Sequence, residues 1–228
     1  MKNIVIGIEG LVGSGKTSIC REIIHKLPNS IILHGGNLYR GIVYAFMKQN
    51  KQLSDLKNMD IAQIMKKLNV KIELENRETV VYVNDKKIDE EELQNEKTSM
   101  AVSVVGNVAD NSKLFIFARN IINDFKEKYN VIVSGRALME IYPDLDYHFL
   151  ITASLDERVK RKSMQYNNVN LQELREHIMK RDELQEKSGF YKMYQNTIKV
   201  DVTECKTVED STNKVCEYIE ETKLIANI

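Results

Sequence analysis

IGIEGLVGSGKTS, residues 6–18, contains the pattern Gly-x-x-x-x-Gly-Lys-Thr at residues 10–17. The β-branched run at residues 4–8 predicts a buried parallel strand, and helical spacing of apolar residues predicts a helix at 18–27. A glycine-rich loop between a strand and a helix turns backbone N–H groups toward a phosphate, and the helix adds its positive dipole end. We therefore predict a phosphate-binding loop that holds a nucleotide.

Side chains around this loop complete the predicted nucleotide site. Lys16 is expected to reach the outer phosphates, and Thr17 to supply an oxygen to a hydrated magnesium ion. Glu9, at the end of the strand, is a second candidate for the magnesium shell, but a carboxylate there caps nearby N–H groups about as often. The predicted nucleotide contacts are Gly10, Gly13, Ser14, Gly15, Lys16, Thr17 and Ser18.

The composition argues against several other classes of protein. The chain has 228 residues, 43% of them apolar, which suits one α/β core with inserted subdomains. Its 33 basic and 33 acidic residues balance, so no general field favours a nucleic acid polymer or an anionic membrane. The cysteines lack metal or redox spacing, and no leader or membrane-spanning run is found. We expect a cytoplasmic protein with reduced thiols and a small-molecule partner; the sequence indicates no particular protein partner.

Strand and helix patterns alternate along the rest of the chain. Further strands are predicted at residues 30–35, 129–135, 147–154 and 197–203. Helices are predicted at residues 38–49, 61–68, 98–108, 113–128, 155–185, with a break near 167–168, and 208–224. Residues 70–88 change to a period of two around turns at 75–77 and 84–85, which predicts a small antiparallel insert. The alternation predicts an α/β fold with a central parallel sheet and helices on both faces.

Two classes of phosphate-loop protein do not fit the sequence. GTPases need an Asn-Lys-x-Asp segment, which the chain lacks, and ATPase motors need a strand that ends in an acid, whereas the two middle strands predicted here end in VIVSG and FLITAS without one. Small kinases instead use arginines to neutralise the transferred phosphoryl group. Arg158 and Arg161 lie three residues apart on one helical face, and Arg181 lies on the next predicted helix. As a group they predict a lid, although each one singly also suits a surface ion pair.

Over nearly its whole length the chain resembles the cytidylate kinase family of nucleoside monophosphate kinases. The resemblance is carried by the phosphate loop, LYR at 38–40, GR at 135–136, ASLDERVKR at 153–161 and HIMKRDEL at 177–184. It implies transfer of the γ-phosphoryl group of ATP to a nucleoside monophosphate, with magnesium. It also implies a single three-layer phosphate-loop kinase domain over residues 1–228. Its parts would be a core at 1–34, 126–153 and 191–228, an acceptor-binding insert with the hairpin at 35–125, and a helical lid at 154–190.

The same resemblance implies roles for single residues. Arg40 and Arg136 match family arginines that clamp the acceptor phosphate, a task that suits the guanidinium fork. Ser103 matches a serine that contacts the base. Tyr39 could pack on the base, although a tyrosine at a helix start is more often part of the core. The catalytic set that the resemblance implies is Lys16, Arg158, Arg161 and Arg181.

Departures from the family pattern gather at the acceptor. Ser134 and Ala137 replace two acids, one near magnesium and one that reads the pyrimidine nucleoside. Each lost charge-assisted hydrogen bond removes on the order of 1.5 to 3 kcal/mol, so several losses weaken an ordinary acceptor by powers of ten. Further replacements are Gly35 for a serine, Ser112 for an arginine with Lys113 beside it, Gln185 for an acid and Ser188 for an arginine.

Three functions therefore stay open on the sequence. A kinase for a pyrimidine nucleoside monophosphate, CMP or dCMP, is preferred, and a kinase for another small acceptor comes next. The third is a regulatory protein whose bound ATP moves the lid and recruits a partner without transfer. The losses at Ser134 and Ala137 favour the last two, whereas the retained arginines favour catalysis. His34 and Cys20 are expected to be structural.

Overall fold

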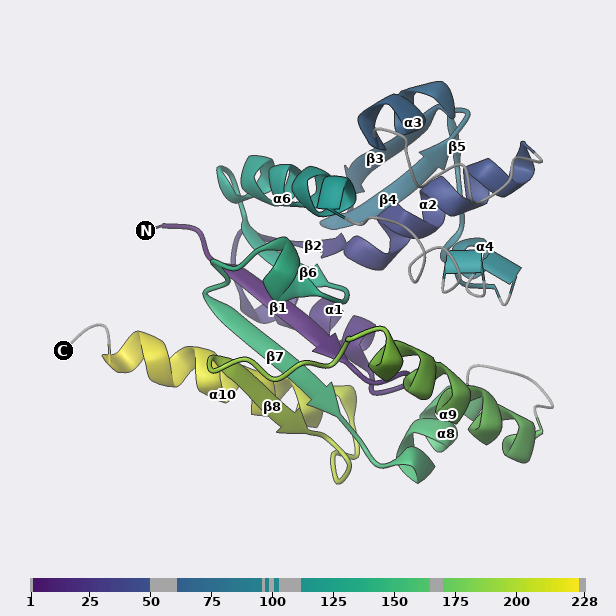
Figure 1. Ribbon diagram of the computed structural model, residues 1–228. Coiled ribbons are helices and arrows are strands. Elements are labelled where there is room, and N and C mark those ends of the chain that lie inside the picture. The colour runs from purple at the N-terminus through teal and green to yellow at the C-terminus, as the bar shows by residue number, and fades with distance from the viewer. Residues whose placement is uncertain are drawn as a thin grey trace.

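The computed structural model describes residues 2–49, 61–95, 97–98, 101–102, 112–164 and 170–225. Figure 1 shows a twisted sheet through the middle of the molecule with helices on both of its faces. The strand order is β3-β4-β2-β6-β1-β7-β8, and β5 pairs with β4. The parallel strands are β1 (Val5–Gly10), β2 (Ser30–His34), β6 (Asn130–Ser134), β7 (Tyr147–Thr152) and β8 (Thr197–Asp201). The predicted α/β fold with a central parallel sheet is confirmed.

Helices form the two outer layers. They are α1 (Lys16–Lys26), α2 (Gly35–Lys48), α3 (Ile61–Lys67), α4 (Glu90–Gln94), α6 (Ser112–Lys126), α7 (Leu138–Ile141), α8 (Leu155–Ser163), α9 (Leu171–Lys187) and α10 (Val208–Ile225). Apolar residues of α1 and α10 cover one face of the parallel strands, and those of α6 and α7 cover the other. The described part of the chain contains no helix that is both long and apolar enough to cross a membrane.

The hairpin differs in one respect from the predicted insert. Its strands β3 (Val70–Glu75), β4 (Glu78–Val83) and β5 (Lys86–Lys87) are antiparallel, as predicted, but β4 also pairs in parallel with β2. Arg77, in the turn, donates from Nε to the Ser30 carbonyl (2.8 Å) and accepts at its own carbonyl from Ile32 N–H (2.8 Å). The hairpin therefore extends the main sheet rather than standing apart from it.

Two helix boundaries follow from the backbone rather than from apolar periodicity. The first helix begins at Lys16 and not at residue 18, because Gly15 adopts a left-handed conformation and ends the loop there. The helix α7 was not predicted, and it starts after Ala137, which also has a positive φ of 54°. The helix predicted at 98–108 lies mostly outside the described residues, and the break at 167–168 wholly so.

The register of the sheet brings three segments to one edge. Ile8 of β1 and His34 of β2 are both paired with Ser134 of β6, so these three strands end side by side. The phosphate loop, the start of α2 and Gly135-Arg136 all follow directly from these ends. The carboxyl edge of a parallel sheet is the usual place for a ligand, and here it collects the predicted site residues.

Candidate functional site

The loop from Gly10 to Lys16 has the backbone of a phosphate cradle. A Cβ at Gly10 would lie 2.2 Å from the Ile151 carbonyl oxygen, so no larger residue fits between β1 and β7. Gly15 has a φ of 92°, a conformation that glycine adopts without strain. The loop passes directly into α1, so the unpaired N–H groups of that helix face the space above the loop. The arrangement fits a polyphosphate.

An ion pair holds this loop from behind. Asp182 Oδ1 accepts from Val12 N–H (3.3 Å), and Arg158 Nη1 donates to the Val12 carbonyl (3.1 Å) and also pairs with Asp182. The Val12 side chain, only 6% exposed, packs against Val159 of α8 and Ile178 of α9. The backbone N–H, the backbone carbonyl and the side chain of Val12 are therefore all held by residues of α8 and α9.

Lys16 points back onto its own loop. Its Nζ donates to the carbonyls of Gly10 (2.8 Å) and Leu11 (2.9 Å). Burial, together with the nearby charges of Arg136 and Arg181, lowers the pKa of Lys16 to about 7. The Ser14 hydroxyl is buried and has no hydrogen-bond partner in the described part of the chain. Both groups have hydrogen-bonding capacity that a phosphate could use.

Three arginines gather beside Lys16. Burial lowers the pKa of Arg40 to about 10, and the charges of Arg136 and Arg181 contribute to the same shift. Arg40 Nε is buried and, within the described ranges, has no hydrogen-bond partner. A guanidinium cannot lose its charge near neutral pH, so an unpaired buried nitrogen next to other cations is unfavourable without an anion. The cluster of Lys16, Arg40, Arg136 and Arg181 therefore fits an anionic ligand.

Gln185 and Tyr191 support this cluster from α9 and the segment after it. Gln185 Oε1 accepts from Arg136 Nε (2.9 Å) and from the Tyr191 hydroxyl. Tyr191 has a φ of 66°, which is uncommon for a residue other than glycine. Gln185 is only 9% exposed, and its neutral amide orients Arg136 without cancelling its charge. No local sequence pattern predicts the Tyr191 contact, because it depends on the path of the chain after α9.

Comparison with known proteins identifies the family of the chain. The family model described as "Cytidylate kinase" matches residues 6–222. The chain belongs to the cytidylate kinase family. It is a nucleoside monophosphate kinase-like phosphotransferase, as the resemblance predicted.

Individual relatives agree with the family match. The chain is 27% identical over 226 residues to a cytidylate kinase of Clostridioides difficile, covering 96% of this chain and 99% of the relative. It is 28% identical, with the same coverage, to a cytidylate kinase of Clostridium botulinum strain Loch Maree. A solved structure of an uncharacterised protein from Eubacterium ventriosum is similar in fold, with a TM-score of 0.51, 18% identity and coverage of 96% and 99%.

In this cytidylate kinase family member, Arg161 is bound to protein groups. Its Nη2 donates to the carbonyls of Val202 (2.7 Å) and Cys205 (3.1 Å), and its Nε donates to Glu157 (2.9 Å). Arg161 Nη1 lies 3.5 Å from the Ser14 carbonyl oxygen, directly behind the loop. Together with Arg158 it joins α8 to the loop and to the end of β8.

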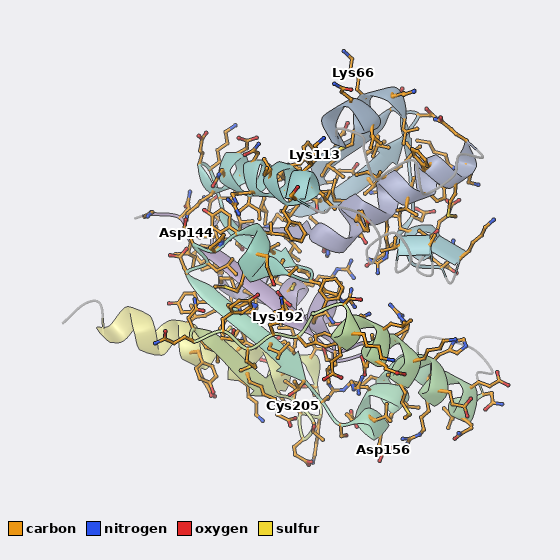
Figure 2. The ribbon with its side chains drawn as sticks, viewed as in Figure 1. Lys66, Lys113, Asp144, Asp156, Lys192 and Cys205 are labelled. Carbon is orange, nitrogen blue, oxygen red and sulfur yellow. The ribbon has the colours of Figure 1, made fainter. Side chains whose placement is uncertain are left out.

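The carboxylates at this edge already have protein partners. Glu9 Oε1 accepts from Leu138 N–H (2.6 Å) at the start of α7, and His148 Nε2 lies 3.3 Å from the same oxygen. Glu140 pairs with Lys192 (3.2 Å), which Figure 2 labels on the chain between α9 and β8. Glu9 thus caps α7 through one oxygen, the structural role that the sequence left open beside a magnesium role.

The remaining predicted residues lie as follows. Thr17 is partly exposed and Ser18 is exposed on the first turn of α1, beside the loop. The Tyr39 hydroxyl is buried without a partner among the described residues, and burial raises its pKa to about 12. Ser103 lies outside the described residues. Lys113, at the start of α6, is exposed (Figure 2).

A separate cavity of about 260 Å³ lies beside the hairpin, between β4, α4 and the start of α2. Several of its charged groups are paired with one another. Glu78 accepts from Arg21 (2.9 Å) and lies 2.8 Å from His34 Nε2, and Arg21 also pairs with Glu90 (2.9 Å). These pairs give His34 a structural role, as expected. Cys20 is fully buried in the core, also as expected.

Within the described ranges, no group of three or more His, Cys, Asp or Glu side chains could hold a metal ion by itself. A magnesium ion bound together with a nucleotide takes phosphate oxygens among its ligands. The loop hydroxyl of Thr17 fits that arrangement, because magnesium in nucleotide sites usually keeps several waters and takes few protein ligands.

Proposed function

We propose that this protein transfers the γ-phosphoryl group of ATP to the phosphate of a pyrimidine nucleoside monophosphate, with CMP and dCMP as the first candidates. The observation that carries the proposal is the buried Arg40 Nε without a described partner, close to the charges of Arg136 and Arg181, which also act on Lys16. Such a cluster, next to a phosphate loop, suits two phosphate groups that must approach one another. The pyrimidine preference is supported by the family alone.

The chain's own groups have separable tasks in this proposal. The loop N–H groups and Lys16 bind the donor phosphates, and Lys16 exchanges its two loop carbonyls for phosphate oxygens. Arg40 and Arg136 grip the acceptor phosphate, and Arg181, whose charge acts on both Lys16 and Arg40, stabilises the phosphates of both ligands. Their positive charges reduce the repulsion between two anions and stabilise the transferred group. Bound magnesium would supply further charge neutralisation, held through Thr17 with Glu9 in its outer shell.

The roles of the remaining residues are also proposals. We propose that Arg158 and Arg161 contact phosphates through N–H groups other than those bound here to the Val12 and Val202 carbonyls. Tyr39 and Ser103 are proposed to meet the base. We also keep residues 35–125 as the acceptor-binding part, 154–190 as the lid and the rest as the core; the separate apolar cluster under α2, α3 and the hairpin supports the first of these.

The test is ADP release with ATP and magnesium across a panel of ribonucleoside and deoxyribonucleoside monophosphates. Lys16→Ala serves as the blank, and ATP binding is measured separately. Strong stimulation by CMP, dCMP or UMP supports the proposal. If ATP binds but no nucleoside monophosphate stimulates ADP release, the proposal is contradicted, and other small acceptors or a protein partner should be tested next.

A further inference from the structure

One turn of α9 touches both halves of the site. Asp182 accepts from Val12 N–H of the donor loop (3.3 Å), and Gln185 accepts from Arg136 of the acceptor cluster (2.9 Å). Arg181, whose charge acts on both Lys16 and Arg40, stands beside Asp182 in the same turn. Residues three apart on a helix lie on neighbouring positions of one face, so a shift of this turn moves both contacts together.

We propose that Asp182 and Gln185 are positioning residues that couple the two sites, so that a nucleotide on the loop prepares Arg136 for the acceptor. The inference rests on the proposed function and adds to it that a bound donor strengthens acceptor binding. By thermodynamic linkage, the acceptor then improves donor binding by the same factor.

The donor end of this connection is tightly built. The Val12 N–H donates to Asp182, and the Val12 carbonyl accepts from Arg158. Arg158 also donates to the Ala153 carbonyl (3.1 Å). A Cβ at Gly13 would lie 3.2 Å from the Arg158 carbonyl oxygen, so the loop and α8 are already in close contact. A change in the loop on nucleotide binding therefore reaches Asp182 directly.

The acceptor end depends on a single amide oxygen. Arg Nε is a donor only, so it requires Gln185 to turn Oε1 toward it, and the Tyr191 hydroxyl takes the second lone pair. With both lone pairs used, Gln185 has one orientation, and the direction of the Arg136 guanidinium follows the position of α9. The remaining donors of Gln185 are its two amide N–H groups.

The experiment measures the dissociation constant of the fastest acceptor from the panel, with and without a non-hydrolysable ATP analogue and magnesium. For the unaltered protein we expect the analogue to tighten acceptor binding about tenfold, within the usual range of coupling between sites. Asp182→Asn and Gln185→Met should each reduce that factor to about twofold or less. Gln185→Met leaves the Val12 contact intact, so it tests the coupling if Asp182→Asn disturbs folding.

Glu183→Gln is the matched control, because Glu183 lies in the same turn and forms a surface ion pair with Lys187. It should keep the full factor, and thermal melting checks that all variants are folded. A coupling factor near one in the unaltered protein overturns the inference, as does a factor that both variants retain. Failure of every acceptor to bind the unaltered protein instead overturns the proposed function on which the inference rests.

Discussion

The phosphate loop and the arginine cluster lie side by side but are stabilised in opposite ways. The loop is held by the protein itself, since Val12 is fixed by Asp182 and Arg158, and Lys16 is bound to two loop carbonyls. The cluster, in contrast, contains a buried Arg40 nitrogen without a described partner beside two more arginines. The backbone of the donor loop is therefore shaped before a ligand arrives, whereas a ligand anion would give the acceptor half a partner for its Arg40 nitrogen.

The largest expected effect concerns the residue shared by the two halves. Lys16→Ala should lower acceptor-stimulated ADP release by about a thousandfold, because a charge aimed at the transferred group is lost. Steady-state kinetics measure this loss. Lys26→Ala, at the exposed end of the same helix, is the control and should leave the rate unchanged. A loss below tenfold for Lys16→Ala would contradict the role given to this lysine.

The second prediction tests the donor half through stability. Arg158→Met should lower the free energy of unfolding by about 2 to 3 kcal/mol, because Asp182 is left without its cation and the Val12 carbonyl without its donor. Denaturant titration measures the change. Arg175→Met removes a surface pair with Asp156 and should cost less than about 1 kcal/mol. Equal losses in the two variants would show that the loop is not held as described.

The third prediction is a change in the free energy of unfolding that is opposite in sign to the change expected for Arg158→Met. Arg40→Met should raise the free energy of unfolding by about 1 to 2 kcal/mol, because it removes an unpaired buried nitrogen from a cluster of like charges. The same variant should raise the acceptor KM by about tenfold to a hundredfold and leave the ATP KM nearly unchanged. Thermal melting and kinetics on one preparation give both values. A less stable variant would refute the contrast between the two halves.

The fourth prediction is a dependence of donor binding on pH. In the free protein the pKa of Lys16 is lowered to about 7, so raising the pH above 7 removes the proton that donor binding needs. The ATP dissociation constant should then rise by up to about tenfold per pH unit between pH 7 and 9, until the pKa in the complex is reached. Calorimetric titrations at several pH values test this. The Lys16→Ala protein should lack the slope, and a flat curve for the unaltered protein would argue against a lowered pKa.

Several features of the fold were predictable because local sequence specifies them. The glycines and the strand before them specify the loop, and alternating patterns specify the parallel sheet and the turns of the hairpin. The pairing of β4 with β2 was not predictable, since it depends on contacts of Arg77 with Ser30, 47 residues away. The helix α7 was not predictable for a similar reason, because its first N–H donates to Glu9, which lies on a distant strand.

By itself, the sequence determined the phosphate loop, the α/β class and the family, and it singled out a set of candidate arginines. Only the tertiary structure decided the contacts of each arginine: Arg158 holds the loop, Arg161 joins α8 to the end of β8, and Arg40 has a buried nitrogen without a partner among the described residues. Short-range patterns encode backbone conformation, so they specify elements and motifs. The partner of a charged side chain depends on which distant segments pack together, as with Val12 and Asp182, which lie 170 residues apart.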